Sequence, residues 1–369
     1  MRPSSVFNIA SASLVLFRGA SALVARGIRT PTYTVSSYIG SATDYPDLTR
    51  DGGGGASVNG INVMFFCDTS LPDPSDPGNI VPGGWATNSY TFIENPEDPL
   101  QQTNFGTALG DGYTIPDMAV NWTAVEYGNW SKEMLWGASM ATLHNDPAAT
   151  WGYLIFQEGL RPTCETCPYV WQYNTLLNVT ATLDGGLVTD RIVDPLFTSP
   201  ELFWGSFALA GEPSTDYLYL FGTEGASLYV ARVDWDSATD LNSYEYYSGS
   251  NNWLGTPSSK SPIFTLPPLT VSVDGSIASG NIFWSPTYST WLSIYMTNDQ
   301  NDFWLTYSTS GTVQGPYAYP VQIFQTCAGC GNYAGNAYPF WLGSDASQAI
   351  LSWSVNGGAE TQMALVTFS

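Results

Sequence analysis

The stretch YLYLFGT (Tyr217–Thr223), followed after a short turn by SLYVARV (Ser227–Val233), decides the fold. An aromatic-rich strand ends in small or polar residues, and a second strand then carries apolar residues at alternate positions, as in a β-hairpin. The same plan returns in WLSIYM (Trp291–Met296) with FWLTYS (Phe303–Ser308). The sequence therefore indicates repeated hairpins of short strands.

Further strand-like runs lie between turn signals along the chain. They are Ile61–Cys67, Met134–Met140, Trp151–Gln157, Ile350–Val355 and Met363–Phe368. The units recur about every 60–80 residues, which suits propeller blades that carry loop insertions, and about five such blades fit the chain. We predict an all-β, five-bladed β-propeller, and a β-sandwich with long loops is the alternative.

Composition supports this fold class and excludes one class of partner. The chain is 44% hydrophobic and only 11% charged, which is typical of a folded globular protein. Its 36 Gly and 24 Pro suit many tight turns. With 10 Lys and Arg against 32 Asp and Glu, the formal net charge is −22, and this charge would repel nucleic acid.

The first 25 residues resemble a secretory signal. Arg2 precedes an apolar run from Ile9 to Phe17, and small residues up to Ala25 follow it. We therefore expect a signal peptide at residues 1–25, a single propeller domain at 26–369, and a secreted, monomeric protein that does not insert into membranes. Three N-x-[ST] sequons predict glycosylation of this extracellular protein, at Asn121, Asn129 and Asn178.

Five cysteines include two C-x-x-C pairs, Cys164 with Cys167 and Cys327 with Cys330. A zinc ribbon places its pairs about 15–20 residues apart, a far shorter separation than here. Because the secretory route is oxidising, we expect all four to form disulfides, with the connectivity left open. The fifth, Cys67, is expected to be a buried free thiol in an apolar strand.

Several short motifs resemble the family named domain of unknown function 4185. They are RDGGGGASVNGINVMFFCDT (Arg50–Thr69), Asn88–Ser89, YLFGT (Tyr219–Thr223), LYVARV (Leu228–Val233), EYY before Trp253, GPY (Gly315–Tyr317) and LSWS (Leu351–Ser354). The resemblance covers most of residues 35–369 and implies a five-bladed propeller related to D-arabinan-degrading glycoside hydrolases. It implies Asp51 and Asp68 as the catalytic pair. Where the family has Gly-Asp-Thr, this chain has Cys67 before Asp68.

The residues lead to the same pair by a register argument. Asn59-Gly60 is the strongest two-residue hairpin signal in the chain, because a type I′ turn needs positive φ at both central positions. Such a turn pairs Val58 with Ile61, so the residue numbers of every further pair sum to 119. Asp51 and Asp68 satisfy this sum and would lie opposite one another, unless a bulge near the glycines shifts the register. Alternatively, both cap backbone amides in turns.

Other candidate residues are weaker. Asn88 is implied by the resemblance as a substrate-binding residue, and Glu158 ends an apolar strand where it could supply a third carboxylate. Tryptophans can stack on sugar rings, although they more often fill blade interfaces; the candidates are Trp136, Trp204, Trp284 and Trp304. His144 is the only histidine, so we expect neither a histidine-based metal site nor a cofactor.

Two functions remain open. The first is a secreted glycoside hydrolase in which one aspartate is the nucleophile or base and the other is the general acid. Few arginines are present, so we expect a neutral polysaccharide, for example an arabinan. A close pair favours a retaining reaction. The second is a non-catalytic, lectin-like or surface-interaction propeller, because one fold hosts many functions.

Overall fold

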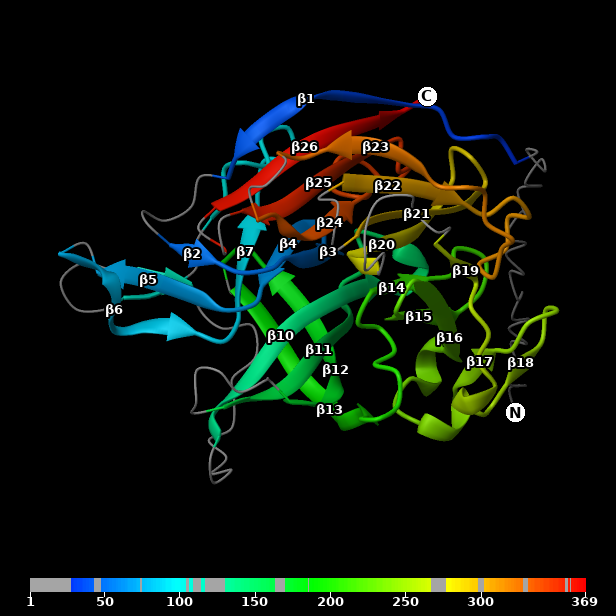
Figure 1. Cartoon of the computed structure of the whole chain (residues 1–369), viewed down its shortest axis with the longest axis horizontal. Coiled ribbons are helices and arrows are strands. Elements are labelled where there is room, and N and C mark those ends of the chain that lie inside the picture. Colours follow the sequence, from blue (N-terminus) through cyan, green and yellow to red (C-terminus); the bar gives the residue numbers. More distant parts are fainter. Residues whose placement is uncertain are drawn as a thin grey trace, which may run out of the picture.

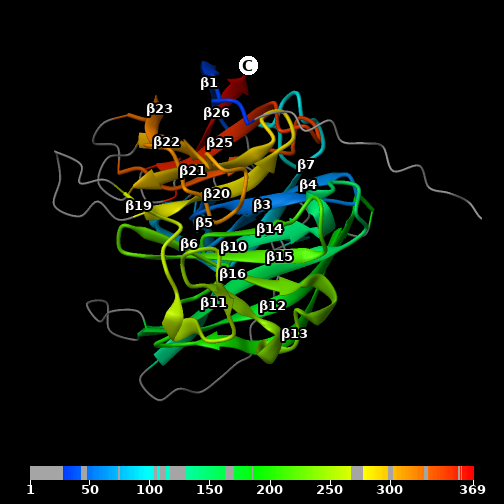
Figure 2. The same ribbon diagram turned by 90° about the vertical axis from the view of Figure 1, so that its right-hand side faces the viewer.

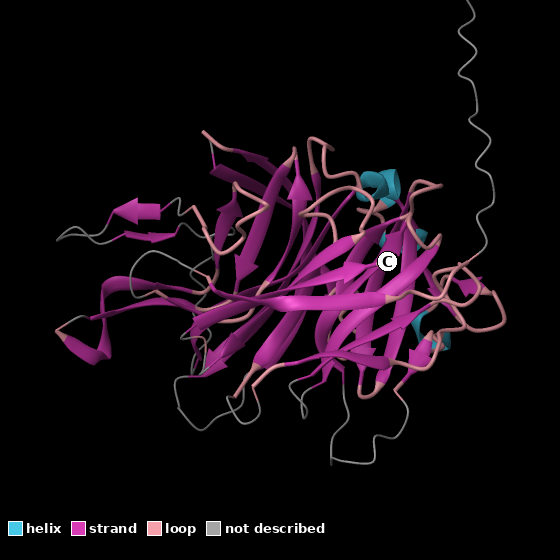
Figure 3. Ribbon diagram, turned by 90° about the horizontal axis from the view of Figure 1, so that it is seen from above, coloured by secondary structure: helices cyan, strands magenta, loops and turns pink. Residues whose placement is uncertain are grey.

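The two ends of the described chain meet in one sheet, where Tyr33 lies opposite Phe368. The structure is a computed structural model. It describes residues 28–42, 48–73, 75–103, 106–108, 114–116, 130–162, 170–184, 186–266, 277–297, 302–327, 331–355, 358 and 360–369. The expected signal peptide, residues 1–25, lies outside these ranges. Strands dominate the described chain, and its helices are single short turns (Figure 3).

Five antiparallel sheets, here called blades I to V, follow one another along the chain. Blade I contains β3 (Gly54–Val58), β4 (Ile61–Phe66) and β7 (Ser89–Ile93). Blade II contains β10 (Trp130–Thr142), β11 (Gly152–Pro162), β12 (Val170–Thr182) and β13 (Gly186–Thr198). Blade III contains β14 (Ala208–Gly211), β15 (Tyr217–Glu224), β16 (Ser227–Asp234), β17 (Glu245–Tyr247), β18 (Trp253–Leu254) and β19 (Phe264–Thr265).

Blades IV and V complete the ring. Blade IV contains β20 (Ile277–Ser285), β21 (Thr290–Thr297), β22 (Asp302–Tyr307) and β23 (Val321–Gln325). Blade V contains β24 (Tyr333–Tyr338), β25 (Gln348–Val355), β26 (Glu360–Phe368) and β1 (Tyr33–Ser41). Because β1 comes from the start of the described chain and β26 from its end, their pairing ties the ring closed. Figure 2 shows this blade at one end of the molecule and β11 to β13 at the other.

Smaller elements surround the blades. A sheet of β2 (Thr49–Arg50), β5 (Thr69–Asp73) and β6 (Asp76–Ala86) extends blade I, and the β5–β6 hairpin projects from the body at the left of Figure 1. A two-stranded sheet contains β8 (Gly106–Ala108) and β9 (Thr114–Pro116). Short 3₁₀ turns are η2 (Leu143–Asn145), η3 (Trp235–Ser237), η4 (Leu241–Ser243) and η5 (Pro257–Ser259).

The first strands of the five blades, β3, β10, β14, β20 and β24, contact one another in a ring. The β10 and β14 segments run in the same direction, because Ser139 donates to the carbonyl of Gly205 and, farther along both segments, Asn145 donates to that of Gly211. The ring therefore has two distinct ends. We call the end where these strands begin the proximal end, and the end where they finish the distal end.

The core lies between the blades. Phe65 meets Phe156 between blades I and II, Tyr219 meets Trp291 between blades III and IV, and all eight residues of β21 are buried. A blade is covered on both faces by its neighbours, so its strands carry nearly continuous apolar runs. The predicted five-bladed propeller is therefore confirmed, whereas the alternative β-sandwich would have only two packed sheets.

Candidate functional site

The Asn59-Gly60 hairpin forms with the predicted register. Val58 lies opposite Ile61, and the pairs continue with the sum of 119 to Gly54 opposite Phe65. Both turn residues have positive φ, 53° and 74°. Beyond the site, Arg50 lies opposite Thr69 with the same sum. The register part of the sequence argument is therefore confirmed.

Asp51 and Asp68 lie at the proximal end, in a break between two ladders. The β3–β4 ladder stops on one side of them, and the β2–β5 ladder starts on the other. Asp51 N donates to Asp68 O at 2.8 Å, but the carbonyl of Asp51 accepts from Cys67 N at 2.6 Å. Gly52 adopts φ +74° in this break. The backbone of Asp51 is therefore bonded to two successive residues, Cys67 and Asp68, so a bulge interrupts the one-to-one opposition that the register predicts.

The Asp51 side chain lies beside blade V. The hydroxyl of Tyr333, the first residue of β24, lies near Asp51 and Ser354. Burial raises the pKa of Tyr333, and the neighbouring Asp51 carboxylate raises that pKa further. Burial likewise raises the pKa of the Cys67 thiol, and the charge of Asp51 adds to this effect. Asp51 is therefore held beside two protonated groups.

The Asp68 side chain contacts blade II instead. The indole Nε1 of Trp136 donates to Asp68 Oδ1 at 3.3 Å. The Trp136 ring also packs edge-on against Trp171, with ring centroids 5.1 Å apart. Each aspartate of blade I thus has a neighbour on a different blade, and Trp136 is brought to the predicted pair as a positioning group.

The other predicted substrate-binding residues are placed differently. Asn88 is fully buried, directly before β7 at the proximal end of blade I. Trp204 is 0% exposed, and its Nε1 donates to Glu201, so its indole face is closed to a sugar. Trp284 lies one residue before the distal end of β20 and therefore does not join the aspartates. Trp304 packs in the core between blades III and IV.

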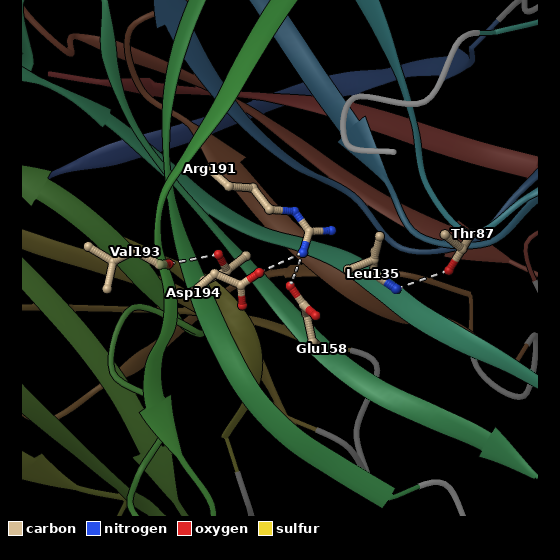
Figure 4. A network of polar contacts seen from close by, with 7 residues as sticks. Thr87, Leu135, Glu158, Arg191, Val193 and Asp194 are labelled. Carbon is tan, nitrogen blue, oxygen red and sulfur yellow. Dashed lines mark hydrogen bonds and ion pairs between the residues drawn. The ribbon is translucent and has the colours of Figure 1, made fainter. Parts of the chain in front are cut away.

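Glu158 belongs to a buried ion-pair network in blade II (Figure 4). Its side chain is 1% exposed, and Arg191 Nη1 donates to Glu158 Oε1 at 2.9 Å and to Asp194 Oδ2 at 3.0 Å. Nearby, Leu135 N donates to Thr87 Oγ1. Because Arg191 stabilises the charged form, Glu158 is suited to a structural role rather than to proton donation.

The sequence argument missed Tyr333 and Asn336, which touch the Asp51 segment from β24. Asn336 Nδ2 donates to Gly53 O at 3.0 Å. About 280 residues separate these partners in the chain, and only closure of the ring brings them together. No local motif marks either residue. Only the packing of blade V against blade I in the closed ring identifies them.

The modification sites are only partly described. Cys164, Cys167 and Cys330 lie outside the described residues, as do Asn121 and Asn129, so the disulfides and these two glycosylation sites stay predictions. Cys67 is a free cysteine, as predicted, but it lies directly after β4 rather than within a strand and is only partly buried. Asn178, the third predicted glycosylation site, is described, and its glycosylation also stays a prediction.

Asn178 lies within β12, opposite both Tyr153 and Asp190, and its Oδ1 is buried. A central, paired strand is unlike the exposed loop that a sequon predicts. Within the described ranges, no group of three or more His, Cys, Asp or Glu side chains is arranged to hold a metal ion. No helix in the described part of the chain could cross a membrane.

A cavity lies on the ring axis towards the distal end. All five first strands contribute to its lining, for example through Ser57, Met140, Leu209, Phe283 and Tyr338. It shares Phe340 and Trp341 with a wider groove on the distal face. Apolar and aromatic side chains dominate this end, whereas the carboxylates lie at the proximal end.

Comparisons with solved structures find the same fold. The chain resembles a "putative hydrolase" from Bacteroides ovatus, with a TM-score of 0.60, 14% identity, and coverage of 88% of this chain and 86% of that one. It resembles a protein described as "Glycoside hydrolase", with a TM-score of 0.50, 8% identity, and coverage of 90% and 92%. No family profile and no curated protein matches the sequence.

Proposed function

We propose that this chain is a glycoside hydrolase that acts on a neutral polysaccharide through the carboxylates of Asp51 and Asp68. The observation that carries the proposal is their placement. Two aspartates of one hairpin meet through their backbones at the proximal end of the ring, where Trp136 from blade II donates to Asp68 and Tyr333 from blade V lies near Asp51. The fold that the chain shares with a protein described as a glycoside hydrolase supports the proposal.

One of the two aspartates acts as the nucleophile or base and the other as the general acid. The Trp136 indole donates to Asp68 Oδ1 at 3.3 Å and positions that carboxylate at the proximal end. The close pair that the sequence register predicts favours a retaining double displacement, which needs carboxyls about 5–5.5 Å apart.

The negative net charge of the protein favours a neutral substrate. The chain has a formal net charge of −22, and an acidic polysaccharide would be repelled. Arg191, the cation nearest to the predicted third carboxylate, is already engaged by Glu158 and Asp194. The resemblance to arabinan-degrading propellers makes polysaccharides that contain arabinofuranose the first ones to test.

The experiment is a screen of neutral plant, fungal and bacterial polysaccharides with the native protein. We expect reducing sugar to be released from an arabinofuranose-containing glycan, with retained anomeric configuration by proton NMR. Binding to a glycan without any hydrolysis would replace this proposal with the lectin-like one. Inversion would keep the enzyme but remove the close-pair mechanism.

We further propose that the protein is exported, acts as an extracellular monomer, and carries disulfides at its C-x-x-C pairs. The support is the N-terminal pattern and the cysteine spacing. Non-reducing peptide mapping of the secreted protein should find Cys164, Cys167, Cys327 and Cys330 in linked fragments. Free thiols at all four, with stoichiometric zinc, would contradict the disulfides.

A further inference from the structure

A groove lies across the distal face of the ring, at the opposite end from Asp51 and Asp68. Its volume is about 570 Å³, which is within the range of small-molecule binding sites. Blades I, II and V supply its walls, through the turn at Gly60, the loop after β7 from Asn95 to Glu97, the loop after β10 at Pro147, and the segment from Phe340 to Ser344 that follows β24. Loops that only the closed ring brings together therefore form this groove.

The groove continues inwards into the smaller cavity on the ring axis. Ser57, Phe340 and Trp341 line both spaces. The inner cavity has a volume of about 30 Å³, enough for about two groups the size of a water molecule. A ligand in the groove can therefore extend a hydroxyl group, but not a whole ring, towards the axis.

Trp341 brings a polar donor to the junction of the two spaces. It is 3% exposed, and its ring is stacked on Tyr338, with ring centroids 3.9 Å apart and ring planes inclined by 13°. Within the described chain, its Nε1 is buried and has no hydrogen-bond acceptor. A buried donor without an acceptor is costly, because the group has lost its bond to water. The acceptor is therefore expected from a molecule that enters the groove.

Trp304 shows that a missing acceptor alone does not make a binding site. Among the described residues, its Nε1 is likewise buried without an acceptor, but its ring packs in the core between blades III and IV. Trp341 differs because it lines a groove whose rim residues, Glu97 and Ser344, are exposed. A ligand can therefore reach the space beside Trp341.

A buried amide fixes the backbone of Trp341 to blade I. Asn62 is 6% exposed, and its Nδ2 donates to the carbonyl of Trp341 at 3.2 Å, while its Oδ1 accepts from Ser57 Oγ. An amide oxygen has two lone pairs, so Asn62 Oδ1 can accept a second bond from a ligand. Asn62 and Ser57 both line the groove. The groove therefore offers a donor at Trp341 and an acceptor at Asn62 within one fixed unit.

The lining of the groove favours a neutral ligand with several hydroxyl groups. Glu97 is the one charged residue among those that line it, and the formal net charge of −22 repels anions. A purely apolar ligand would fit Phe340 and Leu342 but would leave Trp341 Nε1 without an acceptor. A sugar meets both conditions, because its C–H face packs on apolar side chains and its hydroxyls donate and accept.

We propose that the distal groove is a second, non-catalytic binding site for a neutral sugar unit of a glycan. Trp341 Nε1 donates to an oxygen of the sugar, and Phe340 packs on its C–H face. The groove lies at the other end of the ring from the two aspartates, so the inference does not rest on the proposed function. In a hydrolase, such a site keeps a polysaccharide bound between cleavage events.

The test is a titration of protein that carries ¹⁵N-labelled tryptophan, followed by NMR of the indole N–H groups. Arabinotriose and maltotriose are the neutral probes, and trigalacturonic acid is the anionic one. Asp51→Asn protein is titrated so that no probe is hydrolysed, and Trp341→Phe in the same background assigns the Trp341 signal. We expect a neutral probe to shift this signal to saturation with a Kd of about 1 mM or below, and trigalacturonic acid to bind about tenfold more weakly or not at all.

Two tryptophan variants give the matched comparison. Trp341→Phe removes the donor and keeps a ring on Tyr338, so it should weaken binding of the neutral probe about tenfold in calorimetry. Trp304→Phe also removes a buried indole N–H without an acceptor in the described chain, and it should bind within about twofold of native protein. If Trp341→Phe fails to fold, a native crystal soaked with the same probe decides, and a sugar oxygen within about 3.5 Å of Trp341 Nε1 is expected.

Three results would overturn the proposal. They are a Trp341 signal that neither neutral probe shifts up to about 20 mM, equal affinities of native protein and Trp341→Phe, and a soaked crystal with an empty groove. Tighter binding of trigalacturonic acid would overturn the neutral ligand class. Glycan hydrolysis without distal binding keeps the proposed enzyme and removes this site, whereas distal binding without hydrolysis does the reverse.

Discussion

The hairpin of β3 and β4 ends in two very different ways. At the distal end, Asn59 and Gly60 form a regular turn, and the loop after β10 fixes it through bonds from Asn59 N to Ala149 O and from Gly60 N to Pro147 O. At the proximal end, the ladder breaks at Asp51 and Asp68, where Trp136 donates to Asp68 and Tyr333 lies near Asp51. One hairpin thus has a structural end and a polar, irregular end.

The difference shows which end of the hairpin can hold two aspartates close together. Two facing carboxylates destabilise a regular sheet, because like charges directly opposite repel. They are tolerated where the ladder is interrupted, as the bulged pairing at Asp51 interrupts it here. Local irregularity that the surrounding structure supports is typical of functional sites.

The largest expected effect comes from Asp51→Asn and Asp68→Asn. Each removes a carboxylate that the proposed reaction needs and keeps its shape, so glycan hydrolysis should fall by about 10³-fold or more. Val188→Ala, on the outer strand of blade II, is the control, because Val188 is 61% exposed, and it should keep activity within about threefold. Circular dichroism should show native folding of all three variants. Substantial hydrolysis in both aspartate variants would contradict the catalytic role of Asp51 and Asp68.

Much of the distal end could be predicted from sequence, because its signals are local. Asn59-Gly60 specifies its turn through two neighbouring residues, and that turn sets the register as far as Asp51 and Asp68. The strands of blades III and IV were visible for the same reason. A hairpin is a local structure, and the apolar pattern that predicts it lies within a few neighbouring residues.

The partners of the aspartates could not be predicted in this way. Tyr333 reaches Asp51 only because blade V closes the ring, and Trp136 reaches Asp68 only because blade II packs beside blade I. Trp204 and Trp284 show the converse: both look like sugar platforms in sequence, but one fills a blade interface and the other lies at the distal end. Residue type alone does not tell which end or which face a tryptophan occupies.

The next effect concerns the buried ion pair of blade II. Glu158→Gln removes the buried partner of Arg191, which keeps only the more exposed Asp194, and should lower the free energy of unfolding by about 2 kcal/mol. Glu245→Gln is the matched control, because Glu245 is 41% exposed where it pairs with Arg232 at 2.7 Å. It should cost less than about 1 kcal/mol. Urea unfolding measures both, and equal losses would contradict the burial argument.

Substitutions of Gly52 and Gly60 allow a direct comparison of the two hairpin ends, because both glycines adopt φ +74°. A Cβ on Gly60 would meet nothing within 4 Å, so Gly60→Ala should cost only the left-handed strain, about 1 kcal/mol. A Cβ on Gly52 would lie 2.8 Å from Cys67 Sγ. Gly52→Ala should therefore cost about 1 kcal/mol more and also reduce hydrolysis, whereas equal costs in urea unfolding would show that the break readily adapts.

The smallest effect is the pH dependence that Cys67 contributes at the proximal end. Its pKa in the folded state is raised by burial and by the charge of Asp51, so the folded protein favours the neutral thiol. The stability that depends on this thiol is fully present below the unfolded pKa of about 8.5 and is lost as the pH rises through the folded pKa. Between pH 8 and 9.5, native protein should therefore lose about 1 kcal/mol more unfolding free energy than Cys67→Ala, in which all tyrosines still titrate. Urea unfolding at both pH values gives this double difference. Parallel losses would show that the thiolate is tolerated in the folded site, and Asp51 would then have a more polar neighbour than the structure indicates.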